Sequence, residues 1–322
     1  MEQELYPRSL SEFEAHFASQ EDCLRYLAQI RWPNGFVCPH CGGHDAWMTT
    51  RGLWHCQACD RQTSVTAGTI LHGVRRPLTL WFRAMWHITS QKYGANALGL
   101  KRSLGLGSYQ TAWEWLHKLR RAMVRPGRDR LMGVVQVDET YVGGKKKPGK
   151  RGRGAAGKVA IGIAVEDKDL EGIGRIRLAV LSDVSSISLE AFIENSVAPG
   201  STVVTDGWKS YGGLSAKGYR HEICEDPKDL ALPHLVASLL KRWLLGTYQG
   251  AVRRGCLPYY LDEFAFRFNR RTSSSRGKLF FRLVQHLLAV DPVPRPTLVG
   301  LCKGNGEDEF DKDYAELGDH NI

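Results

Sequence analysis

The chain has 322 residues, of which 43% are hydrophobic, and a formal net charge of +10 at pH 7. This length allows two or three domains with buried cores, and no apolar run approaches the roughly 18 to 20 residues of a membrane-spanning helix. The N-terminal segment is too polar and acidic for a signal peptide. We therefore expect a cytoplasmic, nucleoid-associated protein.

Positive charge is concentrated in the first 302 residues. Residues 303–322 contain seven acidic residues and two lysines, so the rest of the chain carries about +15. A basic body of this size favours a polyanionic partner through phosphate contacts and counterion release, although it also serves solubility. We expect residues 291–322, which are Pro-rich and then acidic, to be a disordered tail.

Residues 1–32 are expected to be a helical lead-in. Apolar residues recur with helical spacing between positions 10 and 31. Ser19 is a suitable N-cap for the second part of this segment, with Glu21 and Asp22 in the first turn. We assign this segment no chemistry.

Residues 33–73 contain two Cys-x-x-Cys motifs separated by 14 residues. The four cysteines are Cys38, Cys41, Cys56 and Cys59. Four thiolates at this spacing complete the tetrahedral shell of a structural Zn²⁺, which predicts a zinc ribbon with short strands in 47–54 and 62–70. A redox role would suit a single motif better than two. Such a ribbon binds DNA in some proteins and only holds a module together in others, and the sequence favours neither.

The other four cysteines are scattered singly along the chain. They are Cys23, Cys224, Cys256 and Cys302. Because they lie in apolar or helical segments, we expect them to be buried free thiols.

Residues 74–130 have the pattern of a helix-turn-helix region. Helices are predicted at 78–93, 94–106 and 108–124, the last beginning with Ser108 as its N-cap. In a helix-turn-helix motif the second helix enters the major groove of DNA. An ordinary three-helix bundle with a solvated basic face is the alternative. Basic residues expected to contact phosphates are Lys101, Arg102, Lys118, Arg120 and Arg121, and Gln110 and Thr111 are expected to reach bases.

Residues 131–290 change to a mixed pattern of strands and helices. Strands are predicted at 134–142, 158–166, 173–183 and 202–205, with a helix at 188–197 and long helices after position 233. This order is typical of an α/β fold of the RNase H-like type. Periodicity alone does not separate it from other mixed folds.

A basic loop separates the first two predicted strands. Six of the nine residues from Lys145 to Arg153 are basic, with Pro and Gly between them. They are Lys145, Lys146, Lys147, Lys150, Arg151 and Arg153. We expect this loop to contact DNA, and a disordered solvated loop is the alternative.

Two aspartates lie at strand ends. Asp138 ends the apolar run of the first strand, and Asp206 follows the fourth strand 68 residues later. Carboxylates are natural ligands of the divalent cations that activate a nucleophile and neutralise charge at a phosphodiester bond. Strand alternation places Gln136 with Asp138 on one face and Glu139 on the other.

A later helix offers a polar pair. His234 follows Pro233, and Lys241 comes seven residues later, which places both side chains on one helical face. A neutral imidazole can bind a metal, and an ammonium can hold a phosphate. A helical histidine beside a proline is more often structural, but its pairing with Lys241 and the two strand aspartates favours a role at the site.

Several stretches resemble a known family. They are CPHCGG, CQACDRQTSVTAGTI, VVQVDETYVGGK, VVTDGWKSY, SLLKRWLLGTYQGAV and YLDEFAFRFNRR. The chain is similar in them to bacterial insertion-sequence transposases of the DDE superfamily, in the group that joins a zinc ribbon to an RNase H-like catalytic domain.

The resemblance implies roles for four residues. Asp138 and Asp206 would bind Mg²⁺ or Mn²⁺, His234 would occupy a third position that is Glu, Asn or His in the group, and Lys241 would stand seven residues later. Replacing glutamate by histidine removes one negative charge, so three other glutamates remain candidates for the third ligand. These are Glu139, Glu190 and Glu263.

The resemblance also implies an activity. Such a protein would bind the terminal inverted repeats of its element, cut there, and join the ends to target DNA as a homodimer or higher oligomer. A catalytically inactive DNA-binding derivative and a purely hydrolytic RNase H-like nuclease are the alternatives.

Overall fold

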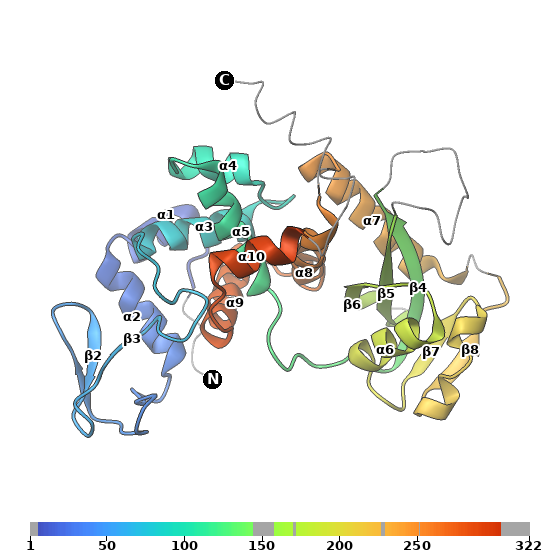
Figure 1. Cartoon of the computed structure of the whole chain (residues 1–322), viewed down its shortest axis with the longest axis horizontal. Helices are drawn as coiled ribbons and strands as arrows, with labels where there is room; N and C mark the ends of the chain where they lie inside the picture. Colours follow the sequence, from blue (N-terminus) through green and yellow to red (C-terminus); the bar gives the residue numbers. More distant parts are fainter. Residues whose placement is uncertain (1–5, 144–157, 170–171, 227–228, 251, 304–322) are drawn as a thin grey trace. The chain divides into compact units, whose positions relative to one another are not determined.

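The computed structural model describes residues 6–143, 158–169, 172–226, 229–250 and 252–303 (Figure 1). The chain divides into two compact units. Unit 1 comprises residues 1–126 and 272–298, and unit 2 comprises residues 127–271 and 299–322. None of the helices in the described residues is long and apolar enough to cross a membrane.

The zinc ribbon of unit 1 is a small antiparallel sheet. Strands β1 (Ala46–Met48), β2 (Leu53–Cys56) and β3 (Gln62–Ser64) pair in the order β1-β2-β3. The ribbon is thus confirmed, with strands shorter than the sequence predicted.

Two helices precede the ribbon. They are α1 (Leu10–His16) and α2 (Gln20–Arg31). The hydroxyl of Ser19 accepts a hydrogen bond from the Asp22 N–H at 3.1 Å, and the Asp22 carboxylate accepts one from the Ser19 N–H at 3.0 Å. This reciprocal pair satisfies two backbone donors at the start of α2, so Ser19 is the cap that the sequence indicated.

Four helices form the rest of unit 1. These are α3 (Leu78–Ser90), α4 (Ala97–Leu104), α5 (Tyr109–Arg121) and α9 (Arg276–Ala289). Gly105 ends α4 at φ 62°, and the Ser108 hydroxyl caps α5 by accepting from the Gln110 N–H at 3.1 Å. Three helices with a Gly-containing turn before the third therefore form as predicted.

Helix α9 packs against α2 and α3 in unit 1. Its fully buried Phe280 contacts the rings of Phe13 and Phe82. We expected residues up to 290 to belong with the sheet of the RNase H-like domain. The periodicity showed that α9 has an apolar face, but it did not show which partner that face packs against.

Unit 2 is built on a five-stranded mixed sheet with the order β6-β5-β4-β7-β8. The strands are β4 (Val134–Val142), β5 (Val159–Asp167), β6 (Ile173–Val180), β7 (Thr202–Thr205) and β8 (Arg220–Ile223). The pairs β4–β5 and β5–β6 are antiparallel, whereas β4–β7 and β7–β8 are parallel. This mixed sheet with its helices confirms an α/β fold of the RNase H-like type.

Three helices complete unit 2. They are α6 (Ser186–Ser196), α7 (Ala231–Tyr248) and α8 (Leu257–Phe268). α6 contributes Leu189 and Phe192 to a core cluster with Val135 and Val137 of β4, and α7 packs against β4 and β5. Because strand residues alternate, the residues between these two valines face away from the α6 core.

Two expectations for the C-terminal region are wrong. Residues within 291–322 were expected to be a disordered tail, but Arg295–Lys303 form helix α10; residues 304–322 lie outside the described part. Cys256 and Cys302 were expected to be free thiols and instead form a disulfide. Cys256 is the N-cap residue before α8 and Cys302 lies in α10, and their spatial proximity is not visible in sequence spacing.

Candidate active site

A cavity of about 470 Å³ lies between the middle of β4 and one face of α7, so Asp138 is within the strand and not at its end as expected. Its lining residues are Asp138, Glu139, Thr140, His234, Ala237, Ser238 and Lys241. The four helical residues are spaced by three, four and seven positions, so they share one face of α7. The structure thus brings three of the four predicted site residues to one cavity.

Asp138 faces α7 across this cavity. Its Oδ2 atom lies 3.2 Å from Nε2 of His234. Burial raises the pKa of Asp138; the backbone N–H of Glu139 opposes the rise, the Glu139 charge adds to it, and smaller contributions come from His234 and Asp206. Because burial makes ionisation of this carboxyl group costly, a nearby cation stabilises its ionised form.

Asp206 directly follows β7, the strand that pairs with the Asp138-bearing strand β4. β4 and β7 pair in parallel, with Val134 beside Thr202 and Gln136 beside Val204. The offset of this register equals the 68 residues between the two aspartates, so its continuation sets Asp206 beside Asp138. Adjacent strands are about 4.8 Å apart. Both side chains then point to the face that α7 covers.

The turn after Asp206 requires glycine. Gly207 has φ 74°, and a Cβ atom there would lie 2.6 Å from Cγ2 of Ile223. The N–H of Trp208 donates to Oδ1 of Asp206 at 3.0 Å. Backbone conformation and this hydrogen bond together set the direction of the Asp206 carboxylate.

Lys241 and Arg242 are both exposed residues of α7, but only Lys241 lines the cavity. Burial lowers the pKa of Lys241, the nearby charge of Lys158 lowers it further, and Asp138 raises it. An ammonium in this position can bind an anionic oxygen that enters the cavity.

Gln136 anchors the start of α7 and was not identified from the sequence. Its Oε1 accepts a hydrogen bond from the Leu232 N–H at 3.3 Å, and its Nε2 donates to Oδ2 of Asp167 at 2.9 Å. Leu230, the residue before α7, supplies no side-chain cap, so β4 supplies the acceptor instead. The alternation that places Gln136 on the Asp138 face was the available signal.

The three reserve glutamates are engaged elsewhere. Glu139 also lines the cavity, but its Oε2 accepts from the buried hydroxyl of Tyr211 at 3.1 Å. Glu190 pairs with Lys217 at 3.1 Å. The fully buried Glu263 pairs with Arg267 at 3.1 Å. Among these four candidates in the described residues, His234 forms an ion pair with Asp138.

Asp138, Asp206 and His234 fit a divalent metal by donor chemistry. Two carboxylates and an imidazole suit Mg²⁺ or Mn²⁺, and the nitrogen donor shifts the preference toward Mn²⁺. Within the described residues, their ligand atoms are not gathered within 4.8 Å as the ribbon sulfurs are.

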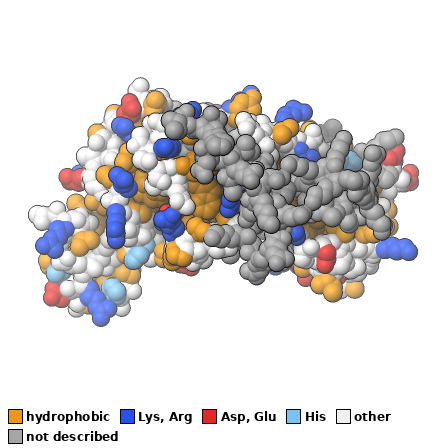
Figure 2. Space-filling model, turned by 45° about the horizontal axis from the view of Figure 1, so that its top comes forward, with side chains coloured by type: hydrophobic (Ala, Val, Ile, Leu, Met, Phe, Trp, Pro, Cys, Tyr) orange, Lys and Arg blue, Asp and Glu red, His pale blue; other side chains and the backbone are white. Residues whose placement is uncertain are grey.

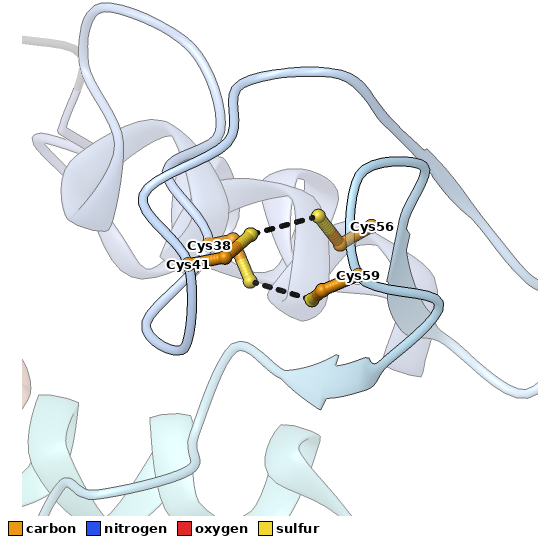
Figure 3. A group of neighbouring side chains, drawn as sticks. All are labelled: Cys38, Cys41, Cys56 and Cys59. Carbon is orange, nitrogen blue, oxygen red and sulfur yellow. Dashed lines mark hydrogen bonds between the residues drawn. The ribbon is translucent and has the colours of Figure 1, made fainter.

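The four ribbon cysteines form a compact metal centre (Figure 3). The Sγ atoms of Cys38 and Cys59 are 3.7 Å apart, and those of Cys41 and Cys56 are 3.6 Å apart. A tetrahedral Zn²⁺ with Zn–S bonds of about 2.3 Å requires S–S separations of about 3.8 Å. The sulfur positions therefore fit Zn²⁺, as the motif spacing predicted.

The residues expected to contact DNA differ in exposure. Arg102 and Gln110 are exposed, and Lys101, Thr111 and Arg121 are half-buried. Lys118 is half-buried and pairs with Glu114 at 3.3 Å. On the face shown in Figure 2, basic side chains are dispersed over unit 1 with hydrophobic ones between them.

Arg120 corrects one of these expectations. It is 1% exposed and donates a hydrogen bond to the Ala95 carbonyl at 3.1 Å, so its guanidinium joins helices instead of facing solvent. Helical periodicity identified the charge but not its burial. The six basic residues between 145 and 153 lie outside the described residues.

Two parts of the chain match known protein families. Residues 130–269 match the ISXO2-like transposase domain of the IS1595 type, and residues 18–62 match the corresponding transposase zinc-ribbon domain. This chain belongs to the IS1595-type transposase family of the DDE superfamily.

A relative of this transposase comes from Halobacterium salinarum. It is named an uncharacterized protein in transposable element ISH50 and is 25% identical over 288 residues. The similarity covers 81% of this chain and 94% of the relative.

Proposed function

We propose that this transposase binds the ends of its insertion sequence, cuts them in a metal-dependent reaction and joins the 3′ ends to target DNA. The observation that carries the proposal is the meeting of Asp138 with His234 at the cavity, beside the strand end that bears Asp206. The cavity lies within residues 130–269, which match the transposase domain.

The proposed roles follow from donor chemistry. Asp138, Asp206 and His234 would hold Mg²⁺ or Mn²⁺, which activates the attacking oxygen and neutralises charge at phosphorus when bound. Lys241 would hold a nonbridging oxygen of the scissile phosphate, because its ammonium faces the same cavity. A 3′ hydroxyl in place of water as nucleophile converts cutting into joining.

DNA binding would combine several parts of the chain. The zinc ribbon, the exposed residues of α4 and α5, and the basic segment 145–153 supply positive charge for phosphate contacts. Joining two element ends to one target needs both ends in one complex, so we propose a homodimer or higher oligomer on DNA.

Two other functions share these features. A hydrolytic nuclease would use the same carboxylates without joining, and a DNA-binding derivative would keep the fold without cutting. The retained polar residues of the cavity favour an active enzyme over the second alternative.

The test uses purified full-length protein, labelled duplex carrying the element's terminal sequence, and a supercoiled target plasmid. Reactions contain added Mg²⁺, added Mn²⁺ or no added divalent metal, so that the ribbon zinc is not stripped by a chelator. We expect cleavage at the element end and joined products only with added metal. Cut ends without joined products would indicate a nuclease, and binding without cutting would indicate the DNA-binding derivative.

A further inference from the structure

A buried hydrogen bond links the 3-10 helix that follows Asp206 to the residue after Asp138 on β4. The hydroxyl of Tyr211 donates to Oε2 of Glu139 at 3.1 Å. Tyr211 is 0% exposed and Glu139 is 9% exposed. The sequence suggested Glu139 only as a candidate third ligand, and it suggested no role for Tyr211.

Tyr211 is connected to Asp206 through one turn of backbone. Its N–H donates to the Trp208 carbonyl at 2.9 Å, and the Trp208 N–H donates to Oδ1 of Asp206 at 3.0 Å. The 3-10 helix η2 (Lys209–Tyr211) therefore connects the Asp206 carboxylate to the Tyr211 ring.

Glu139 is connected to Asp138 as its neighbour on β4. The backbone N–H of Glu139 is adjacent to the Asp138 carboxyl and lowers its pKa, against the larger effect of burial. Its own side chain lies on the opposite face of the strand, where it meets Tyr211. A shift of the Glu139 side chain would therefore move the donor that orients Asp138.

We propose that Tyr211 and Glu139 are positioning residues that set the separation and direction of the Asp138 and Asp206 carboxylates for metal binding. Three hydrogen bonds connect Asp206 through Trp208 and Tyr211 to Glu139, and Glu139 is the chain neighbour of Asp138. This inference rests on the proposed metal site.

The surroundings of Tyr211 suit this role. Burial raises its pKa, and the charges of Glu139 and Asp138 raise it further, so the hydroxyl remains a donor at every working pH. Tyr211 packs in the core cluster with Val135 and Val137 of β4. The ring is thus fixed by packing, and the hydroxyl adds a directional contact to Glu139.

Tyr219 provides a matched control. It is a buried tyrosine of the same core cluster, and its hydroxyl donates to the Val197 carbonyl at 3.1 Å. Tyr211→Phe and Tyr219→Phe each remove one buried hydroxyl and one hydrogen bond of about 1 kcal/mol. Only the first removes a bond to the Glu139 side chain.

The experiment measures Mn²⁺ binding to the zinc-loaded, full-length protein by calorimetry, together with its thermal unfolding. We expect Tyr211→Phe to weaken Mn²⁺ binding by about 10-fold or more, as partners of metal ligands typically do. Tyr219→Phe should bind Mn²⁺ like the wild type while losing similar thermal stability. Equal Mn²⁺ affinity in the two variants would overturn the inference.

A second pair of variants tests Glu139 directly. Glu139→Gln keeps an oxygen that can accept from Tyr211, whereas Glu139→Leu does not. We expect a larger loss of Mn²⁺ affinity in Glu139→Leu, and equal losses in both variants would contradict the role of the hydrogen bond.

Asp138→Asn separates this inference from the proposed function. If Asp138→Asn weakens Mn²⁺ binding and Tyr211→Phe does not, the positioning role fails and the metal site stands. If Asp138→Asn leaves Mn²⁺ binding unchanged, the proposed metal site fails and the inference fails with it.

Discussion

Nε2 of His234 lies 3.2 Å from Oδ2 of Asp138, so a polar contact between side chains joins the first turn of α7 to the middle of β4. This contact defines the third corner of the proposed metal site. The three glutamates considered for that place, Glu139, Glu190 and Glu263, have other partners in the described residues.

Removal of the His234 imidazole tests that corner. We predict that His234→Ala lowers metal-dependent cleavage by at least about 10-fold, the loss seen even for indirect partners of metal ligands. Leu235→Ala, an exposed position one residue later on α7, should cleave like the wild type. A His234→Ala variant with the same metal titration curve as the wild type would remove His234 from the site.

A carboxylate at the same position should change metal preference. His234→Glu restores the charge that the histidine lacks, and oxygen donors suit Mg²⁺ better than nitrogen donors do. We predict that His234→Glu stays active and that its ratio of Mg²⁺- to Mn²⁺-supported cleavage rises. An unchanged ratio would show that residue 234 does not contact the metal.

Lys241 and Arg242 form a matched pair of cationic neighbours on α7. Lys241 lines the cavity and Arg242 does not, so we predict that Lys241→Met lowers the cleavage rate by about 10²-fold, as loss of an oxyanion-binding donor does. Arg242→Met removes the same charge and should have little effect. Rates are measured at saturating protein, so that equal losses in both variants would indicate a general charge effect instead.

We expect the four ribbon cysteines to bind the zinc of this protein. We predict about one Zn²⁺ per chain in the wild type, and loss of that zinc in Cys56→Ser, because the structural site needs four thiolates. Cys224→Ser, which changes a free cysteine outside the cluster, should retain zinc. Metal analysis of the three purified proteins checks this, and full zinc content in Cys56→Ser would exclude the proposed ligand set.

Local patterns predicted most of the elements that build the site. The bounds of β4 were predicted because apolar and polar residues alternate along most of residues 134–142, and the same alternation placed Gln136 with Asp138 and Glu139 opposite them. The seven-residue spacing of His234 and Lys241 predicted their common face on α7. Such statements need only the geometry of one element.

Features that depend on distant partners were not predictable in this way. Strand β8 has three exposed positions in four, so it shows no apolar pattern, and α9 has an apolar face whose partner only packing decides. Arg120 is charged but satisfied inside the helical unit by the Ala95 carbonyl. The Tyr211–Glu139 bond joins positions 72 residues apart, and neither residue type signals such a contact alone.

The most direct test of the account is strand transfer with pre-cut element ends, which requires the proposed metal site but not prior cleavage. Asp138→Ala, Asp206→Ala and the control Glu222→Ala, an exposed acidic residue on β8, are compared with the wild type at equal DNA occupancy. We predict a loss of about 10³-fold or more in both aspartate variants, because metal-mediated charge stabilisation contributes several kcal/mol, and near wild-type joining in the control. Joining at the wild-type rate by either aspartate variant would contradict the account.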